Sequence, residues 1–287
     1  MTLGLTAFLI VAGAAAGLIG SLLGLGGGIL IIPMLVLVLH VPMHIAIATS
    51  LLCVIATSSA AASKNVSRGI ANVRLGMTME LWTVVGALAG SLLAGRLSGS
   101  TLTLIFGVAM GIMALPMARG VPDQVAEGIE VDDGLQPVPE RFVDSLDGHY
   151  FDQAEGKDVS YRVRRLPVAI AASSVAGVLS GLLGVGGGII KVPVLTIYCD
   201  VPMKAAAATS NFMIGVTAVA SALVYYGRGD VSPFVSAASV VGVFIGSRAG
   251  SAVAGKIHGT TLRRGFAVVM ILIAVQLIWK SLTGGTR

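Results

Sequence analysis

The sequence predicts an all-α fold, a polytopic transmembrane helical bundle made of two repeats of inverted topology. Hydrophobic residues make up 55% of the 287-residue chain and charged residues only 11%, against roughly 25% charged residues in a soluble domain. Apolar runs of about 20 residues, long enough to cross a hydrocarbon core as a helix, recur along the chain. The chain also matches itself at a shift of 160 positions. Together these observations predict about 8–10 membrane segments, some of them broken or re-entrant helices.

The internal repeat sets the predicted domain organisation. Residues 17–50 and 177–210 align without a gap, and 17 of the 34 positions are identical. Chance gives roughly a tenth to an eighth at ordinary residue frequencies, so the match indicates a duplicated unit. We therefore predict one membrane repeat over residues 1–119 and a second over residues 166–287, with a hydrophilic loop at 120–165 between them.

Each half contains five apolar segments in the same order. The first is predicted to be a retained span and not a signal peptide, because it lacks a charged start and recurs in mid-chain. The second has about a dozen residues, too few to cross alone at about 1.5 Å per residue, so we expect a half-helix, a re-entrant piece or the second part of a broken helix. The segments lie near residues 3–23, 28–40, 44–63, 76–95 and 101–117, and near 166–183, 188–199, 203–226, 232–254 and 261–281.

The segment at 120–165 differs in composition from both repeats. It holds 11 of the 14 acidic residues and three of the ten prolines, with few apolar runs. Such a composition is typical of a water-exposed and partly disordered loop. We expect this acidic loop to lie in the cytoplasm and to connect the repeats without forming the chemical centre.

Positive charges predict opposite orientations for the two repeats. Lys and Arg gather at 64–75 in the first half, but one loop later, at 255–264, in the second. Cytoplasmic loops carry the excess of Lys and Arg, so both loops are assigned to the cytoplasm of a multi-pass protein of the inner cell membrane. Inverted repeats are typical of secondary transporters, which bind their substrate near mid-membrane. The net charge of +5 comes from such loop residues and indicates no nucleic-acid partner.

Two glycine clusters, each followed by a proline, interrupt the apolar segments. The stretches GLGGGILIIP and GVGGGIIKVP begin at Gly24 and Gly184. Glycine permits backbone angles that break a helix, and Pro33 and Pro193 fit near the start of the helix that follows. Bare N–H groups at a helix start suit an anion, whereas small residues also serve close packing. The glycines predicted to bind the anion are Gly26, Gly27, Gly28, Gly186, Gly187 and Gly188.

A second duplicated signature, VPMHIAIATS and VPMKAAAATS, places hydroxyl groups about two turns into the third segment of each half. Hydroxyls and an amide can donate hydrogen bonds to an oxyanion without carrying a charge. The same groups can bond back to helix carbonyls or join helices, and the sequence leaves both roles open. The candidate ligands are Thr49, Ser50, Thr209, Ser210 and Asn211.

One positive charge breaks the symmetry of the apolar segments. Lys191 follows the second glycine cluster, where the first copy has Ile31. We expect its ammonium to neutralise an anion; the alternative is that it reaches a membrane interface. Acidic residues are nearly absent from the spans, with Glu80 the main exception, so a cation site is not indicated. No cofactor or metal is expected, because the i,i+4 pair His40 and His44 is better explained by a turn.

The doubled GxGGGxxxxP cluster, followed in each copy by VPM and ATS, resembles the TauE/SafE family of sulfite and organosulfur-anion exporters, also called toluene-sulfonate uptake permeases. The resemblance covers both membrane repeats and not the acidic loop. It implies transport of a small sulfur-containing anion such as sulfite, sulfoacetate, thiosulfate or a sulfonate, coupled to a proton or sodium gradient. We therefore expect an exporter that works by alternating access in a lipid bilayer.

Two other functions fit parts of the sequence. A passive anion channel could use the same scaffold, because the glycine and hydroxyl motifs do not specify coupling. A membrane-embedded assembly factor or enzyme is the other alternative. An enzyme needs a catalytic group, and the sequence shows no buried Cys–His pair, carboxylate pair or metal cluster. We therefore expect a protein that is not an enzyme.

Overall fold

The computed structural model confirms a helical membrane protein whose elements begin and end close to the predicted segments. It describes residues 3–22, 28–118, 146–152, 157–253 and 259–283. Within these residues the strands form one short hairpin. In chain order the elements are α1 (Leu3–Leu22), α2 (Gly28–Pro33), the π-helical turn η1 (Met34–Val38), α3 (Met43–Ser67), α4 (Val73–Ala94), α5 (Gly99–Ala118), β1 (Gly148–Asp152), β2 (Lys157–Tyr161), α6 (Leu166–Leu183), α7 (Gly188–Ile197), α8 (Met203–Gly227), α9 (Pro233–Val253) and α10 (Gly259–Leu282).

Five helices in the described part of the chain are long and apolar enough to cross a membrane, judged by length and composition. They are α3, α4, α6, α8 and the stretch Pro233–Gly250 of α9. Shorter apolar stretches come from α1, from α2 with η1, from α5 and from α10. The chain is therefore a multi-pass membrane protein, as the sequence predicts.

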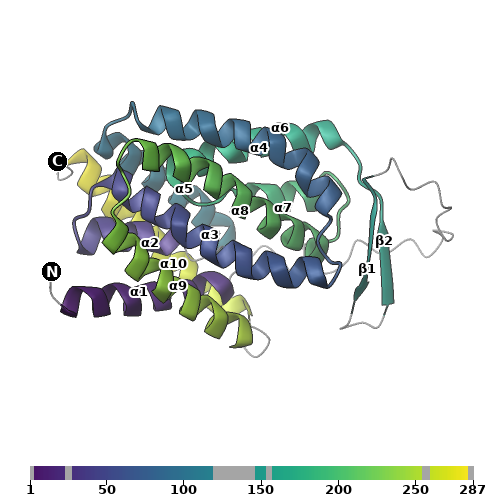
Figure 1. Cartoon of the computed structure of the whole chain (residues 1–287), viewed down its shortest axis with the longest axis horizontal. Coiled ribbons are helices and arrows are strands. Elements are labelled where there is room, and N and C mark those ends of the chain that lie inside the picture. The colour runs from purple at the N-terminus through teal and green to yellow at the C-terminus, as the bar shows by residue number, and fades with distance from the viewer. Residues whose placement is uncertain (1–2, 23–27, 119–145, 153–156, 254–258, 284–287) are drawn as a thin grey trace.

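Each of the main helix pairs contains one helix from each repeat. α1 lies along α9 and α4 lies along α6, while α3 packs on α8 and α5 packs on α10 (Figure 1). Replacing each helix by its repeat partner, α1 by α6 and α9 by α4, turns the first of these contacts into the second. The inner contacts follow the same rule, because α2 packs on α3 as α7 packs on α8. This is the pairing expected of a duplicated unit that folds onto itself.

Glycines bring both outer helix pairs into backbone contact. A Cβ atom on Gly90 of α4 would overlap the carbonyl oxygen of Val178 on α6. In the other pair, a Cβ atom on Gly246 of α9 would overlap the carbonyl oxygen of Ala14 on α1. Small residues of this kind let membrane helices approach closely, so these glycines serve packing.

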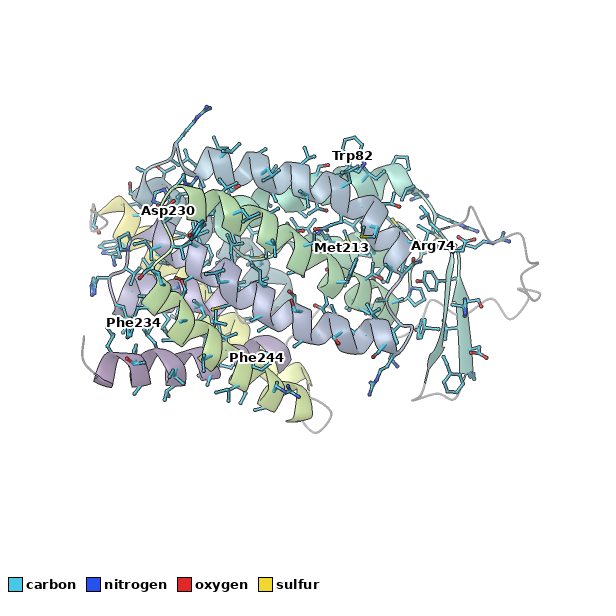
Figure 2. The ribbon with its side chains drawn as sticks, viewed as in Figure 1. Arg74, Trp82, Met213, Asp230, Phe234 and Phe244 are labelled. Carbon is cyan, nitrogen blue, oxygen red and sulfur yellow. The ribbon has the colours of Figure 1, made fainter. Side chains whose placement is uncertain are left out.

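Equivalent positions of the two repeats lie at opposite ends of the bundle. Arg74, in the first turn of α4, lies at the end that carries the β-hairpin (Figure 2). Phe234 stands 160 positions later, in the first turn of α9, and lies at the other end, the end that also carries Asp230 (Figure 2). Two related helix starts therefore face opposite sides of the molecule.

The acidic loop contains a β-hairpin that the sequence analysis does not predict. β1 and β2 pair antiparallel, with Tyr150 opposite Val159. These two side chains and Tyr161 are buried in a cluster that includes Leu75 of α4 and residues around the α7–α8 turn. Part of the expected water-exposed loop is thus ordered against one end of the bundle, while residues 119–145 lie outside the described residues.

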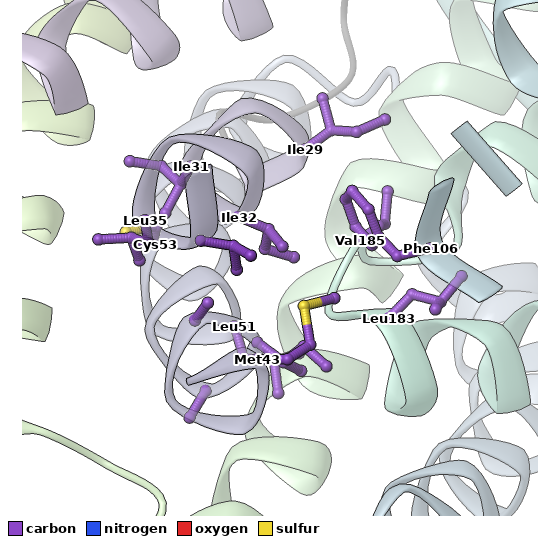
Figure 3. Packing of buried hydrophobic residues seen from close by; sticks show 14 of the residues in the cluster. Ile29, Ile31, Ile32, Leu35, Met43, Leu51, Cys53, Phe106, Leu183 and Val185 are labelled. Atoms are coloured by element: carbon purple, nitrogen blue, oxygen red, sulfur yellow. The ribbon is translucent and has the colours of Figure 1, made fainter. Parts of the chain in front are cut away.

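The apolar core surrounds the second glycine cluster. Ile29 and Ile32 of α2 lie in one cluster with Leu183 and Val185, which flank the glycine that ends α6 (Figure 3). Ile29 and Ile32 are fully buried. The short helix α2 of the first repeat therefore packs beside the helix break of the second repeat.

Candidate functional site

The connection between α6 and α7 has a left-handed backbone. The φ angles are 68° at Gly184, which ends α6, 83° at Gly186, and 70° at Gly187, the N-cap of α7. Other residues lose about 1–2 kcal/mol in this conformation, so the break requires glycine. In the first repeat, Gly28 begins α2, whereas Gly26 and Gly27 lie outside the described residues.

The two helix breaks meet at Ser50. Its Oγ donates toward the carbonyl oxygen of Gly28 at 3.0 Å and toward that of Gly184 at 2.8 Å. A Cβ atom on Gly28 would come within 2.6 Å of the same Oγ, so a larger residue has no room there. In this structure the Ser50 hydroxyl therefore shares its hydrogen bond between two backbone carbonyls, one from the glycine cluster of each repeat.

Ser210, the repeat partner of Ser50, has an unused hydroxyl beside the start of α7. The residue is 1% exposed, and its Oγ has no hydrogen-bond partner among the described residues. A Cβ atom on Gly188, the first residue of α7, would lie 3.2 Å from this oxygen. The first amides of an α-helix have no acceptor within the helix. A buried hydroxyl and helix-start amides thus lie side by side, a donor set that suits an oxyanion.

An apolar side chain from α8 covers the same helix break. Ile214 Cγ2 lies 2.7 Å from the position that a Cβ atom on Gly186 would take, and Ile214 Cδ1 lies 2.5 Å from that on Gly188. Val54 of α3 approaches Gly186 in the same way, at 3.3 Å. In this structure the break is therefore closed on the side of α3 and α8, and a ligand that enters there has to move Ile214.

The two threonines of the repeated signature contact neighbouring helices. Thr49 Oγ1 lies 3.2 Å from Ser236 Oγ on α9. Thr209 Oγ1 accepts a hydrogen bond of 2.9 Å from the backbone N–H of Asn72, the N-cap of α4. Because α4 and α9 are repeat partners, both threonines make the corresponding helix contact. Asn211, which follows this signature, is half-buried.

Lys191 is fully buried and paired with an acidic residue from the other repeat. Its Nζ lies 3.4 Å from Oε2 of Glu80 on α4 and 3.5 Å from Oγ1 of Thr217 on α8. Glu80 is 4% exposed and Lys191 0%. The charge therefore lies inside the protein, with a counter-charge that the sequence analysis does not assign to it. The sequence does contain a sign of this pair. Glu80 and Lys191 are single charged residues in apolar runs, at positions where the other repeat has Val240 and Ile31.

The two prolines lie inside the short helices that follow the glycine clusters. Pro33 is the last residue of α2, and the chain continues as the π-helical turn η1. Lys280 of α10 donates a hydrogen bond of 2.8 Å to the carbonyl oxygen of Val36 in this turn. Pro193 lies within α7, which stays α-helical. The same proline position is therefore followed by a π-helical turn in the first repeat and by α-helix in the second.

The two histidines of the first repeat lie around the turn that precedes α3. His40 has a left-handed φ of 52°, and His44 Nε2 lies 3.1 Å from the carbonyl oxygen of Ala94. Within the described residues, no three side chains of His, Cys, Asp or Glu come together in a group that could hold a metal ion.

Known proteins with similar sequences are named as probable membrane transporters. A family model described as sulfite exporter TauE/SafE matches residues 9–277. The chain is 28% identical to the probable membrane transporter protein YunE of Bacillus subtilis (strain 168), over 96% of this chain and 97% of the relative. It is 28% identical to a probable membrane transporter protein of Xylella fastidiosa (strain Temecula1), over 95% and 96%. A third relative, the probable membrane transporter protein MJ0441 of Methanocaldococcus jannaschii, is 25% identical over 89% and 88%. No solved structure matches the chain significantly.

Proposed function

Because this chain belongs to the TauE/SafE sulfite exporter family, we propose that it exports sulfite or an organosulfonate anion across the inner cell membrane. Relatives named as probable membrane transporters align with it over most of its length, and several of its helices can cross a membrane. It is therefore a membrane transporter that lies in a lipid bilayer and takes a small anion. The choice of a sulfur oxyanion and of outward transport rests on the description of the family.

The donor set at the start of α7 is the observation that carries this proposal. Among the residues that the structure describes, Ser210 Oγ is buried without a partner next to Gly188. Lys191 follows in the same first turn of the helix, and its ammonium lies at Glu80 and Thr217. Sulfite and sulfonates present three oxygens that share a negative charge. Hydroxyl, amide and ammonium groups donate hydrogen bonds to such oxygens, and the charged donor forms the strongest of them.

The duplicated packing supports transport by alternating access. The repeats at residues 1–119 and 166–287 exchange their helix contacts, and Arg74 and Phe234 lie at opposite ends of the bundle (Figure 2). In transporters built from inverted repeats, one repeat rocks against the other around a site between them. The break at α7 meets such a boundary, since Ser50 of the first repeat bonds to Gly184 of the second. The segment at 120–165 then links the repeats on the cytoplasmic side.

Purified protein in liposomes tests the proposal. The liposomes contain unlabelled anion and receive a trace of radiolabelled sulfite, sulfoacetate, thiosulfate or sulfate outside. A transporter shows counterflow, in which the label accumulates transiently against its own gradient, and we expect this for sulfite or sulfoacetate.

Protein-free liposomes provide the background in this experiment. With equal potassium and valinomycin on both sides holding the membrane potential at zero, a passive anion channel equilibrates the label without accumulation, and that result would replace the transporter by a channel on the same scaffold. If none of the four anions moves, the proposed substrate class is wrong.

A further inference from the structure

We propose that Glu80, Lys191 and Thr217 form the proton-coupling site of this transporter, an inference that rests on the proposed anion transport. The three side chains come from α4, α7 and α8, so the site joins both repeats. Glu80 binds the proton, Lys191 binds the anion, and Thr217 holds the carboxylate in place. The proton and the anion then cross the membrane in the same direction.

The contacts of Lys191 leave it able to change partners. Charge-assisted N–H···O bonds measure about 2.7–2.9 Å, whereas Nζ stands 3.4 Å from Glu80 and 3.5 Å from Thr217. Thr217 bonds more closely to the carboxylate, donating to Glu80 Oε1 at 2.5 Å. Glu80 is thus fixed on its threonine side, while the ammonium with its three N–H donors is held loosely.

The pair is not needed for packing helices of this kind. The repeat partners of Glu80 and Lys191 are Val240 and Ile31, so the corresponding helix contact in the other half forms without charges. Ile31 is fully buried there. The threonine remains as Thr57, whose Oγ1 donates to the carbonyl oxygen of Cys53 at 3.1 Å. A charge inside a membrane protein costs free energy and marks a functional site, and here only one copy of the duplicated position carries charges.

A further unused hydroxyl lies at the level of the pair. A Cβ atom on Gly177 of α6 would overlap the carbonyl oxygen of Thr83 on α4, and a second contact one turn later on both helices shows that they run parallel. Four residues earlier on each helix stand Ser173 and Met79, the residue before Glu80. Ser173 is fully buried, and its Oγ has no partner within the described residues. The region thus holds a donor that neither the pair nor a helix carbonyl uses.

Few other ionisable groups come from the helices around the pair. α6 has none, α7 has only Lys191, and α4 and α8 have theirs near the ends apart from Glu80. Tyr225 is engaged elsewhere, since its hydroxyl donates to the carbonyl oxygen of Gly181 at 3.0 Å. The ionisable groups in the described residues of these four helices are Arg74, Glu80, Lys191, Lys204, Tyr225 and Tyr226.

The chemistry of the pair fixes the direction of coupling. While Glu80 is ionised, its carboxylate occupies the ammonium of Lys191 and repels an incoming anion. A proton taken by Glu80 from the water of the open side neutralises the carboxylate, and Lys191 can then hold the anion. One proton and one monovalent anion leave the site with the net charge of the empty pair, whereas with a dianion such as sulfoacetate or thiosulfate one uncompensated negative charge crosses as well. The two therefore bind from one side and leave on the other, which is symport. Export by this route is driven by the anion's own outward concentration gradient, because a proton leaves the cell with each anion.

Glu80→Gln in liposomes tests this coupling. The probe is labelled sulfoacetate or thiosulfate, whichever the wild type moves, because their charges stay constant near neutral pH. We expect wild-type exchange to fall with rising pH by up to about tenfold per unit, the limit for one required proton. We expect an inward proton gradient, with the outside more acidic than the lumen, to drive accumulation of the probe inside the liposomes. In Glu80→Gln, exchange becomes independent of pH and the gradient drives no accumulation. Asp158→Asn, which removes an exposed carboxylate on β2, behaves as the wild type.

A double variant separates loss of coupling from loss of the fold. Glu80→Gln/Lys191→Met removes both charges, and we expect a monodisperse protein in gel filtration that transports neither probe. Gradient-driven accumulation by Glu80→Gln, or wild-type flux in the double variant, would overturn the coupling site. Wild-type exchange without pH dependence would also overturn it while leaving the transport function intact. If the wild type moves none of the anions, the proposed function itself fails.

Discussion

Lys191 and Glu80 are the two charged side chains buried within the described part of the chain. Removing one partner of a buried ion pair costs about 3–5 kcal/mol, because the other charge stays buried alone. Replacing both by neutral groups of similar size is often neutral or stabilising. The pair therefore adds little stability as a whole, and each half of it depends on the other.

The dependence predicts a rescue. Lys191→Met alone leaves Glu80 buried without its counter-charge, so we expect a fall in stability of about 3–5 kcal/mol. Adding Glu80→Gln removes the remaining charge and restores most of that loss. Thermal unfolding of the detergent-purified variants measures both effects. Equal unfolding temperatures for Lys191→Met and the double variant would show that the pair is not energetically coupled.

Substitution by alanine should affect stability differently at the two serines of the repeated signature. Ser50→Ala removes the donor for the carbonyls of Gly28 and Gly184, and unsatisfied buried acceptors cost about 1–3 kcal/mol. Ser210→Ala removes a hydroxyl that has no described partner, so stability stays within about 0.5 kcal/mol.

The readouts for the serine pair are unfolding temperature and anion KM. Under the proposed site, Ser210→Ala raises KM for the transported anion with little change in stability. An unchanged KM in this variant would remove Ser210 from the site, whatever Ser50→Ala does.

The sequence predicts which types of residue form the candidate site, but not which hydrogen-bond and ion-pair partners those residues have. Thr49 and Ser50 match Thr209 and Ser210 letter for letter, yet Ser50 bridges two helix breaks while Ser210 bonds to neither a carbonyl nor a side chain in the described residues. Glu80 and Lys191 are 111 positions apart. Only the packing of α4 and α7 against the same two helices, α6 and α8, brings such distant residues together, and no local pattern encodes it.

Individual helices, by contrast, follow closely from the sequence. The apolar run at 166–183 has a proline at its start and a glycine at its end, and α6 spans those same residues. The short segments after the glycine clusters are short helices, as expected from their length. The β-hairpin is the exception, because Tyr150 and Tyr161 become buried only through contact with the bundle end. Their flanking sequence is acidic and reads as a solvated loop.

The close helix contacts at glycines predict where adding a single methyl group lowers the stability of the protein. Gly246→Ala would place a Cβ atom against the Ala14 backbone, so α9 must move away from α1, and we expect a loss of about 1–3 kcal/mol, typical of overpacking. Gly4→Ala is the matched control on α1, because nothing lies within 4 Å of its added Cβ atom. Thermal unfolding of both variants tests this. A Gly246→Ala protein as stable as Gly4→Ala would contradict the close helix contact.

At the scale of the whole molecule, inverted repeats predict that equivalent loops lie on opposite sides of the membrane. Ser67 and Gly227 end α3 and α8, are related by 160 positions, and are both exposed. A membrane-impermeant thiol reagent added to intact cells should label only Gly227→Cys. In inside-out vesicles it should label only Ser67→Cys, because the loop at 64–75 carries the positive charges.

The wild type is the control for this labelling, since its cysteines, Cys53 and Cys199, are both buried. Labelling of both introduced cysteines from the same side would mean that the repeats have parallel orientations. Alternating access by exchange of the two halves would then lose its support.

The Glu80–Lys191 pair and the β-hairpin each occur once, whereas each membrane helix of the first repeat has a partner in the second. In a perfectly duplicated carrier, the shape open to one face converts into the shape open to the other by swapping the halves, and the two have equal free energy. A feature that belongs to one half alone removes this degeneracy. The empty protein then favours one facing state, and the affinity for the anion measured from the cytoplasm differs from that measured from outside.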